Sequence, residues 1–108
     1  MSSEMPTPIA AYVAADARLD ADGMLAPFAR DAVVRDDGGR HVGIDEIRNW
    51  IQSATVASRA VFTPETWREQ DGHVVVVGST TGNFPGSPIR FTFSFTLRDG
   101  AISGLEIA

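Results

Sequence analysis

The sequence predicts one α+β domain, in which a strongly bent, mixed or antiparallel β-sheet wraps around three N-terminal helices. Three observations support this fold class. Apolar residues recur with helical spacing in much of the first half of the chain, whereas after residue 59 they alternate with polar residues as in strands. Asp-Gly pairs between the alternating segments are typical of tight hairpins. A sheet bent around helices in this way is expected to enclose a cone-shaped, apolar pocket.

The folded part of the chain is expected to begin near Pro8. Residues 1–7 are interpreted as a disordered lead and residues 8–108 as a single domain. Pro8 suits the first turn of a helix, where its missing N–H leaves no hydrogen bond unmade. One face of this first helix carries Ile9, Tyr12, Val13 and Ala17.

Two more helices and one strand are predicted before residue 59. The second helix covers residues 23–30, with Asp20 or Asp22 as its N-terminal cap and Pro27 making it irregular. The strand covers residues 32–37 and is broken by the glycines that follow. The third helix starts after Gly43, and its apolar stripe contains Ile44, Ile47, Trp50, Ile51 and Ala54.

The remaining residues predict a meander of four strands. Asp71-Gly72 and Asp99-Gly100 supply two of its turns. Residues 89–98 alternate strictly, which places apolar side chains on one face of the strand and Thr, Ser and Arg on the other. The apolar row is Ile89, Phe91, Phe93, Phe95 and Leu97. The four predicted strands are residues 59–70, 73–82, 89–98 and 101–108.

Composition excludes several classes of function. The formal net charge of −5 argues against nucleic acid or an anionic membrane as the main partner. All nine basic residues are arginine, so Schiff-base chemistry on lysine is excluded. The absence of cysteine excludes thiolate catalysis and disulfides. No membrane span, leader, metal-ligating spacing or cofactor motif is recognised, so a cytoplasmic protein without a metal or cofactor is expected.

The segment VVRDDGG raises the question of which aspartate faces the core. Strand alternation places Ala32, Val34 and Asp36 on one face, and Val33, Arg35 and Asp37 on the other. Because Arg35 belongs in water, Asp36 is the carboxylate that follows the apolar residues inward. Partial removal of Asp36 from water would suit a general base. The alternative interpretation is a solvated turn, for which Asp and Gly are the usual residues.

The order of these elements resembles the nuclear transport factor 2-like superfamily, which includes ketosteroid isomerases and SnoaL-like polyketide cyclases. The resemblance extends from Pro8 to the C-terminus. It is carried by YVAADARLDADGMLAPFARDAVVRDDG, GIDEIRNWI and FSFTLRDGAISGLEI. The fold that it implies agrees with the pattern above, but this fold hosts unrelated activities.

The first third of the chain is most similar to ketosteroid isomerases. The resemblance implies that Tyr12 is the oxyanion-hole tyrosine and that Asp36 is the general base. A protonated acid on a later strand completes the oxyanion hole in that family, and this chain has Phe93 at the corresponding position. The resemblance therefore implies a weaker stabilisation of any enolate. A buried structural tyrosine, bonded to a backbone carbonyl, is the alternative for Tyr12.

Two further polar residues are candidates for the pocket. Asp16 follows Tyr12 by one helical turn. Because an unpaired buried carboxylate is costly, three positions are considered for it: in the pocket, paired with an arginine, or at the edge of the apolar stripe. The edge position is favoured. His41 follows the glycine bend and could orient Asp36, act as a second acid or base, or simply be solvated.

The expected pocket wall is mostly aromatic, although core packing alone also accounts for such residues. Its predicted members are Phe28, Val34, Trp50, Phe62, Trp67, Phe91, Phe93 and Phe95. Phe84, in the long turn before residue 89, is a candidate for the rim of the pocket or for an interface.

The predicted function is a small-molecule pocket for an apolar or ketone-bearing ligand. Whether the protein is an enzyme stays open at this point; the resemblance implies an intramolecular isomerase or cyclase without a cofactor. One alternative is a non-catalytic ligand-binding or dimerisation module, which Phe93 favours. Another is a hydrolase or dehydratase, in which Asp16, Asp36 and His41 would gather around one water. A homodimer is expected through the outer, Thr- and Ser-rich face of the sheet.

Overall fold

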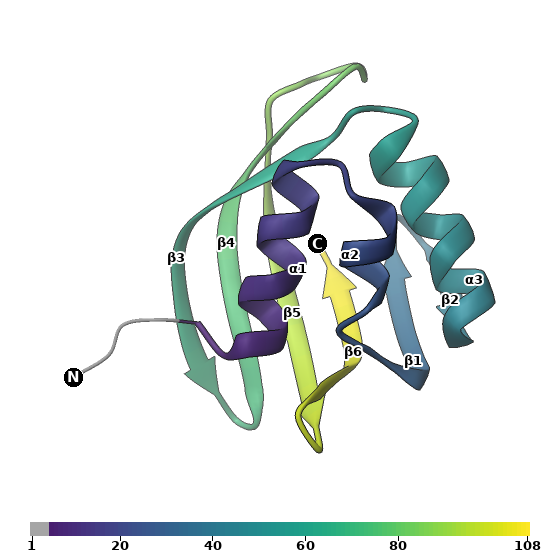
Figure 1. Ribbon diagram of the computed structural model, residues 1–108. Coiled ribbons are helices and arrows are strands. Elements are labelled where there is room, and N and C mark those ends of the chain that lie inside the picture. The colour runs from purple at the N-terminus through teal and green to yellow at the C-terminus, as the bar shows by residue number, and fades with distance from the viewer. Residues whose placement is uncertain (1–4) are drawn as a thin grey trace.

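The computed structural model describes residues 5–108, whose helices lie against one face of a curved β-sheet (Figure 1). Most of the expected disordered lead, residues 1–4, lies outside the described residues. Within them, the first helix already begins at Thr7 and Met5 packs against the core, so regular structure starts before Pro8. In the described part of the chain, no helix is long and apolar enough to cross a membrane.

The six strands of the described chain form a single sheet in the order β2-β1-β6-β5-β4-β3. β1 and β6 are parallel and every other neighbouring pair is antiparallel, so the sheet is mixed. The predicted α+β fold, with helices on one face of a bent sheet, is confirmed. The elements are α1 (Thr7–Ala17), α2 (Ala21–Leu25), β1 (Phe28–Asp36), β2 (Gly39–Val42), α3 (Gly43–Trp50), η1 (Ile51–Val56), β3 (Val61–Gln70), β4 (His73–Thr81), β5 (Ile89–Arg98) and β6 (Ala101–Ile107).

Three Asp-Gly pairs form tight hairpin turns of the same kind. Both residues have positive φ in each pair: 52° and 78° at Asp37-Gly38, 53° and 81° at Asp71-Gly72, and 52° and 77° at Asp99-Gly100. This is the geometry of the turn that matches the twist of antiparallel strands. The two turns predicted in the meander are confirmed. The first strand ends before the glycines at 38 and 39, as predicted, but the turn is formed by Asp37-Gly38 and an additional strand, β2, follows it.

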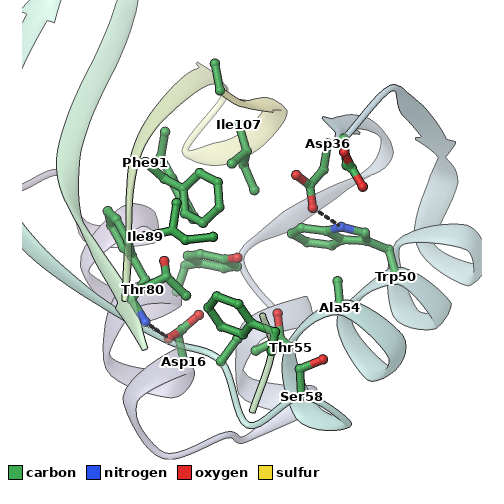
Figure 2. A pocket seen from close by; sticks show the side chains of 17 residues that line it. Asp16, Asp36, Trp50, Ala54, Thr55, Ser58, Thr80, Ile89, Phe91 and Ile107 are labelled. Carbon is green, nitrogen blue, oxygen red and sulfur yellow. Dashed lines mark hydrogen bonds between the residues drawn. The ribbon is translucent and has the colours of Figure 1, made fainter. Parts of the chain in front are cut away.

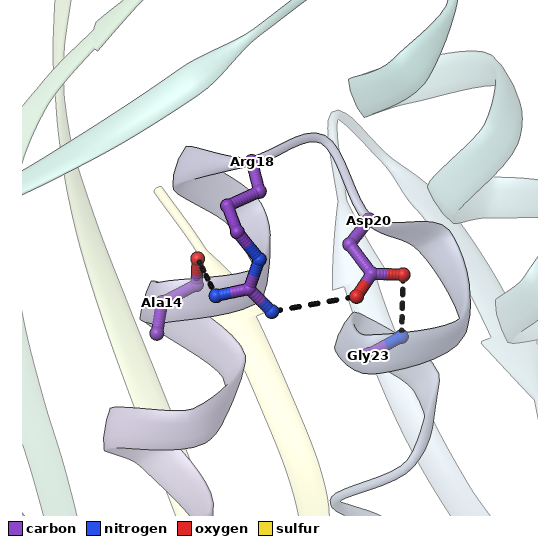
Figure 3. A network of polar contacts seen from close by, with 4 residues as sticks. All are labelled: Ala14, Arg18, Asp20 and Gly23. Carbon is purple, nitrogen blue, oxygen red and sulfur yellow. Dashed lines mark hydrogen bonds and ion pairs between the residues drawn. The ribbon is translucent and has the colours of Figure 1, made fainter.

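The second helix is shorter than predicted. It ends at Leu25, and β1 begins at Phe28, where the chain pairs with Ile102 of β6. This long-range pairing replaces the irregular helix expected up to residue 30. Asp20 is the N-cap: its Oδ1 accepts a hydrogen bond from Gly23 N at 3.1 Å, and Arg18 Nη2 lies 3.4 Å from its Oδ2 (Figure 3).

The third helix changes its winding after Trp50. α3 is followed by a π-helical segment, η1, which holds Thr55 in a buried position. The predicted apolar stripe is largely correct, since Ile47 and Ile51 are fully buried. The wider π-helical turn has no signal in the sequence, yet π-helical turns occur often at functional sites.

The sheet bends where a glycine of β4 faces a bulge of β3. The pairing register shifts between Pro64 and Thr66, opposite Gly78. A Cβ at Gly78 would stand 2.8 Å from Pro64 Cα and would also collide with the carbonyl oxygen of Thr63. The two backbones can therefore approach this closely only because residue 78 has no side chain.

The core lies between the helices and the inner face of the sheet. In the predicted row of β5, Phe93 and Phe95 are buried, and Ile89, Phe91 and Leu97 are half-buried. The opposite row ends in exposed Arg90 and Arg98. The alternation of β5 thus predicted the correct face for each residue.

Candidate functional site

A cavity of about 540 Å³ opens between the helices and the inner face of the sheet (Figure 2). This volume lies in the range of sites for small organic ligands. Its walls come from α1, the end of β1, α3 and η1, strands β3 to β5, and the C-terminus. Apolar side chains dominate them: Trp50, Ala54, Ala60, Phe62, Phe84, Ile89, Phe91, Phe93, Ile107 and Ala108. The polar ones are Tyr12, Asp16, Asp36, Asp37, Thr55, Ser58 and Thr80.

Asp36 closes β1 with its carboxylate at the cavity. Ala32 and Val34 are fully buried and Arg35 is exposed, as the alternation predicted, while Asp36 itself is half-buried. Trp50 Nε1 donates a hydrogen bond to Asp36 Oδ2 at 3.0 Å (Figure 2). Asp37, in the turn, is exposed at the rim of the same cavity. The bond from Trp50 fixes one carboxylate oxygen of Asp36 and leaves the other for a ligand.

His41 lies on β2 and is half-buried. It pairs with Val34 across the β1–β2 hairpin, and its ring centre lies 6.1 Å from that of Trp50. His41 is not among the residues that line the cavity. The hydrogen bond at Asp36 comes from Trp50, and the roles considered for His41 stay predictions.

Tyr12 brings a neutral hydroxyl to the cavity from the middle of α1. The side chain is 1% exposed, and its ring packs edge-on against Phe28 and Phe95 at 5.8 and 5.7 Å. Within residues 5–108, no hydrogen bond holds its hydroxyl. Burial, and then the carboxylates of Asp16 and Asp36, raise the pKa of Tyr12 well above its ordinary value. Tyr12 is consequently a hydrogen-bond donor at any physiological pH.

Asp16 lines the cavity instead of lying at the edge of the helix. It is 3% exposed, and its Oδ1 accepts a hydrogen bond from Phe62 N at 2.8 Å. Burial raises its pKa from 3.8 to about 6, although the bond from Phe62 N opposes this shift. The favoured edge position was wrong because β3 folds over this end of α1, which the helical period alone does not indicate.

The predicted pocket wall divides into two groups. Four of its eight members line the cavity: Trp50, Phe62, Phe91 and Phe93. Phe62 and Phe93 form a stacked pair, with ring centres 4.0 Å apart and planes 14° from parallel. The other four are placed in or against the core beyond the cavity: Phe28, Val34 and Phe95 are buried, and Trp67 is half-buried.

The sequence interpretation missed the polar lining residues Thr55, Ser58 and Thr80. Thr80 had a signal, since it continues the inward row of Val74, Val76 and Gly78 on β4 as its one polar member. Thr55 and Ser58 had none, because the π-helical turn decides their direction. Within residues 5–108, no group of three or more His, Cys, Asp or Glu side chains is placed to hold a metal ion.

Comparison with known proteins gives both close and distant likenesses. A profile of the SnoaL-like domain matches residues 9–105. A candidate polyketide cyclase from Sinorhizobium meliloti is 38% identical, with a TM-score of 0.91 over 96% of this chain and 95% of that one. An NTF2-like protein of unknown function from Cytophaga hutchinsonii is 14% identical, with a TM-score of 0.80; the match covers 100% of this chain and 93% of that one. No curated protein matches the sequence.

A further solved structure, with a ketosteroid isomerase-like fold, comes from Catenulispora acidiphila and holds trimethylamine. It is 18% identical, with a TM-score of 0.79 over 97% of this chain and 86% of that one. The two distant likenesses concern the fold alone. The profile and the 38% identical structure each cover nearly the whole domain, which confirms the resemblance predicted from the sequence. The chain belongs to the SnoaL-like domain family, and its fold is similar to that of nuclear transport factor 2-like proteins.

Proposed function

We propose that the protein is a cofactor-independent enzyme that moves a proton next to the carbonyl group of a small, flat, largely apolar ketone. The observation that carries this proposal is the hydrogen bond from Trp50 Nε1 to Asp36 Oδ2 at a cavity that also receives the Tyr12 hydroxyl. A fixed carboxylate and a neutral donor at one apolar cavity are the two groups that enolisation requires.

In the proposed reaction, Asp36 is the base. Its Oδ1 accepts a proton from the carbon next to the carbonyl, while Trp50 keeps the carboxylate oriented through Oδ2. The electron pair of the broken C–H bond moves onto the carbonyl oxygen, and the Tyr12 hydroxyl donates a hydrogen bond to the enolate that forms. Protonated Asp36 then returns the proton to a different carbon, which restores the carboxylate and leaves an isomer of the substrate.

Phe93 sets the strength of this oxyanion site. It lines the cavity at the position where the resemblance to ketosteroid isomerases implies a second donor, and it stacks on Phe62. A phenyl ring cannot donate a hydrogen bond, and the loss of one oxyanion donor typically costs about 100- to 1000-fold in rate. The alternative function, a non-catalytic ligand-binding module, rests on this residue. The dehydratase alternative finds no support, because His41 lies outside the cavity lining.

Conversion of a β,γ-unsaturated ketone, such as 3-cyclohexen-1-one, to the conjugated enone tests the proposal by absorbance. Asp36→Asn should lower turnover at least about 100-fold while a non-reactive ketone still binds. Asp37→Asn is the matched control: it removes a neighbouring carboxylate at the rim, and Asn tolerates the positive φ of 52°. Turnover that survives in Asp36→Asn would exclude Asp36 as the base. A parent protein that turns over neither this ketone nor bicyclic ones would favour the binding module.

We also propose a homodimer through the outer face of the sheet. A shallow groove lined by Val75, Ser94 and Thr96 crosses this face, and half-buried Ser and Thr rows suit a polar interface. Sedimentation at micromolar concentration should give twice the monomer mass, and Ser94→Arg should give the monomer. A parent protein that sediments as a monomer contradicts this proposal. The cytoplasmic location expected from the sequence stays a prediction.

A further inference from the structure

We propose that Asp16, Thr55 and Thr80 form a second polar subsite, which binds a hydroxyl group of the ligand at the end of the cavity away from Asp36. Figure 2 shows Asp16 and Thr80 on one side of the cavity and the Trp50–Asp36 pair on the other. The inference rests on the proposed function only in taking this cavity as the ligand site, and it holds whether or not Asp36 is catalytic.

The hydroxyl of Thr80 is the first argument for this subsite. Thr80 is 7% exposed and lines the cavity. Among residues 5–108, its Oγ1 is the one side-chain oxygen or nitrogen that is itself fully shielded from solvent and has no hydrogen-bond partner. Buried hydroxyls in native proteins are nearly always paired, so an orphaned one needs an explanation. A ligand group in the cavity would supply the missing partner.

The carboxylate of Asp16 is the second argument. Its Oδ1 is occupied by Phe62 N, and Phe62 is the residue of β3 that lies opposite Thr80 of β4. The same strand pair therefore brings this carboxylate and the Thr80 hydroxyl to one end of the cavity. Thr55, which is 6% exposed, adds a hydroxyl from η1. The second oxygen of the ionised carboxylate, Oδ2, can accept a hydrogen bond, and no side chain or N–H among residues 5–108 donates one to it.

This set of groups selects a hydroxyl over other polar groups. A hydroxyl donates to the Asp16 carboxylate and accepts from the Thr80 hydroxyl, whereas a carbonyl oxygen would face the negative charge of Asp16 without a proton to offer. A ligand carboxylate or phosphate is disfavoured too, because the lining residues include three aspartates and no basic side chain. The stacked Phe62–Phe93 pair lies in the wall near this subsite and suits a flat ring.

Two matched ligand pairs test the subsite without any catalytic assay. They are 2,6-dihydroxynaphthalene against 2-naphthol, and 4,4′-dihydroxybiphenyl against 4-hydroxybiphenyl; the pairs differ in length, so the span of the cavity need not be assumed. Calorimetric titration at about pH 7.5, where Asp16 is mostly ionised, should give at least one diol roughly tenfold tighter binding than its mono-ol. Thr80→Val and Asp16→Asn should each reduce this preference to about twofold or less.

A matched control variant separates the possible outcomes. Thr81→Val removes the hydroxyl of an exposed neighbour outside the cavity lining, and it should keep the diol preference. If Asp16 serves only to hold β3 through Phe62 N, Asp16→Asn, which keeps an oxygen acceptor, will also keep the preference. That result, the same result for Thr80→Val, or a parent protein that binds no diol better than its mono-ol overturns the subsite. A parent protein that prefers the diol but shows no ketone turnover in the separate absorbance assay counts against the proposed function and leaves the subsite standing.

Discussion

The replacement of Asp16 by asparagine should stabilise the protein at neutral pH and have a smaller stabilising effect in acid. Asp16 is 3% exposed, and its pKa rises from 3.8 to about 6 on folding because burial disfavours the charged form. The folded protein thus holds this proton more tightly than the unfolded chain does. Between these two pKa values the folded state binds more protons than the unfolded state, so the free energy of unfolding falls as the pH rises.

The size of the effect follows from the shift. A pKa that moves from 3.8 to about 6 corresponds to roughly 3 kcal/mol of destabilisation once Asp16 is ionised in both states. About 2 kcal/mol of this develops between about pH 4.5 and about pH 8. Asparagine keeps an oxygen acceptor for Phe62 N but cannot ionise. The difference in free energy of unfolding between the variant and the parent should therefore grow by about 2 kcal/mol over that pH range.

Urea unfolding, followed by tryptophan fluorescence at several pH values, measures this difference. Titrations elsewhere in the chain affect parent and variant alike and cancel when the two free energies are subtracted. Asp45→Asn, which removes one exposed negative charge from α3, reports the unspecific effect of the lower charge. A difference between Asp16→Asn and the parent that stays constant to within about 0.5 kcal/mol across this pH range would show that Asp16 is not desolvated in the folded protein.

Three further predictions concern other residues of the site and the sheet. Thr80→Val should raise the free energy of unfolding by about 1 kcal/mol, because it removes a buried hydroxyl without a partner; a clear loss of stability in urea unfolding would mean that the hydroxyl is paired in solution. Trp50→Phe keeps an aromatic ring but removes the donor to Asp36, so kcat for ketone isomerisation should fall roughly 10- to 100-fold with a smaller change in KM, and an unchanged kcat would contradict the proposed role of this bond. Gly78→Ala should destabilise the protein by about 3 kcal/mol or more, since its methyl group would collide with the backbone of β3; thermal unfolding within a few degrees of the parent would refute the close approach of the two strands.

The sequence predicted best where a short period decides the structure. Strict alternation in β5 gave the inward face of Phe93 and Phe95, and the same rule in β1 gave the inward face of Ala32, Val34 and Asp36. The rule did not extend to Asp37, which lies in the turn after β1 and also reaches the rim of the cavity. Alternation, however, gives a face and not a depth. It could not tell that Phe93 lines the cavity whereas Phe95 lies in the core beyond it, because that depends on where the bent sheet meets the helices.

The missed features depend on contacts between distant segments. Asp16 was placed at the edge of the helical stripe, because the helical period cannot show that Phe62, 46 residues later, donates its N–H to the carboxylate. Thr55 enters the cavity through a π-helical turn that no residue pattern announces. Strand β2 was missed for a local reason: the glycines after Asp37 were interpreted only as the end of a strand, although Asp-Gly pairs were recognised as hairpin turns elsewhere in the chain.

The charge of the cavity limits the ketones on which the proposed enzyme could act. With Phe93 in place of a second donor, Tyr12 alone faces the enolate oxygen, and the missing donor corresponds to about 3–4 kcal/mol of transition-state stabilisation. No basic side chain lines the cavity to replace it. This loss of transition-state stabilisation is equivalent to roughly two to three units in the pKa of the C–H proton that Asp36 removes. A ketone whose C–H proton has a pKa lower by this amount would offset the loss. The activity should therefore favour ketones whose proton is already acidified by a double bond or a second carbonyl group. The measurement is the rate of deuterium exchange at the carbon next to the carbonyl, for a series of ketones of increasing C–H acidity. The rate should rise more steeply with this acidity in the presence of the protein than in buffer alone.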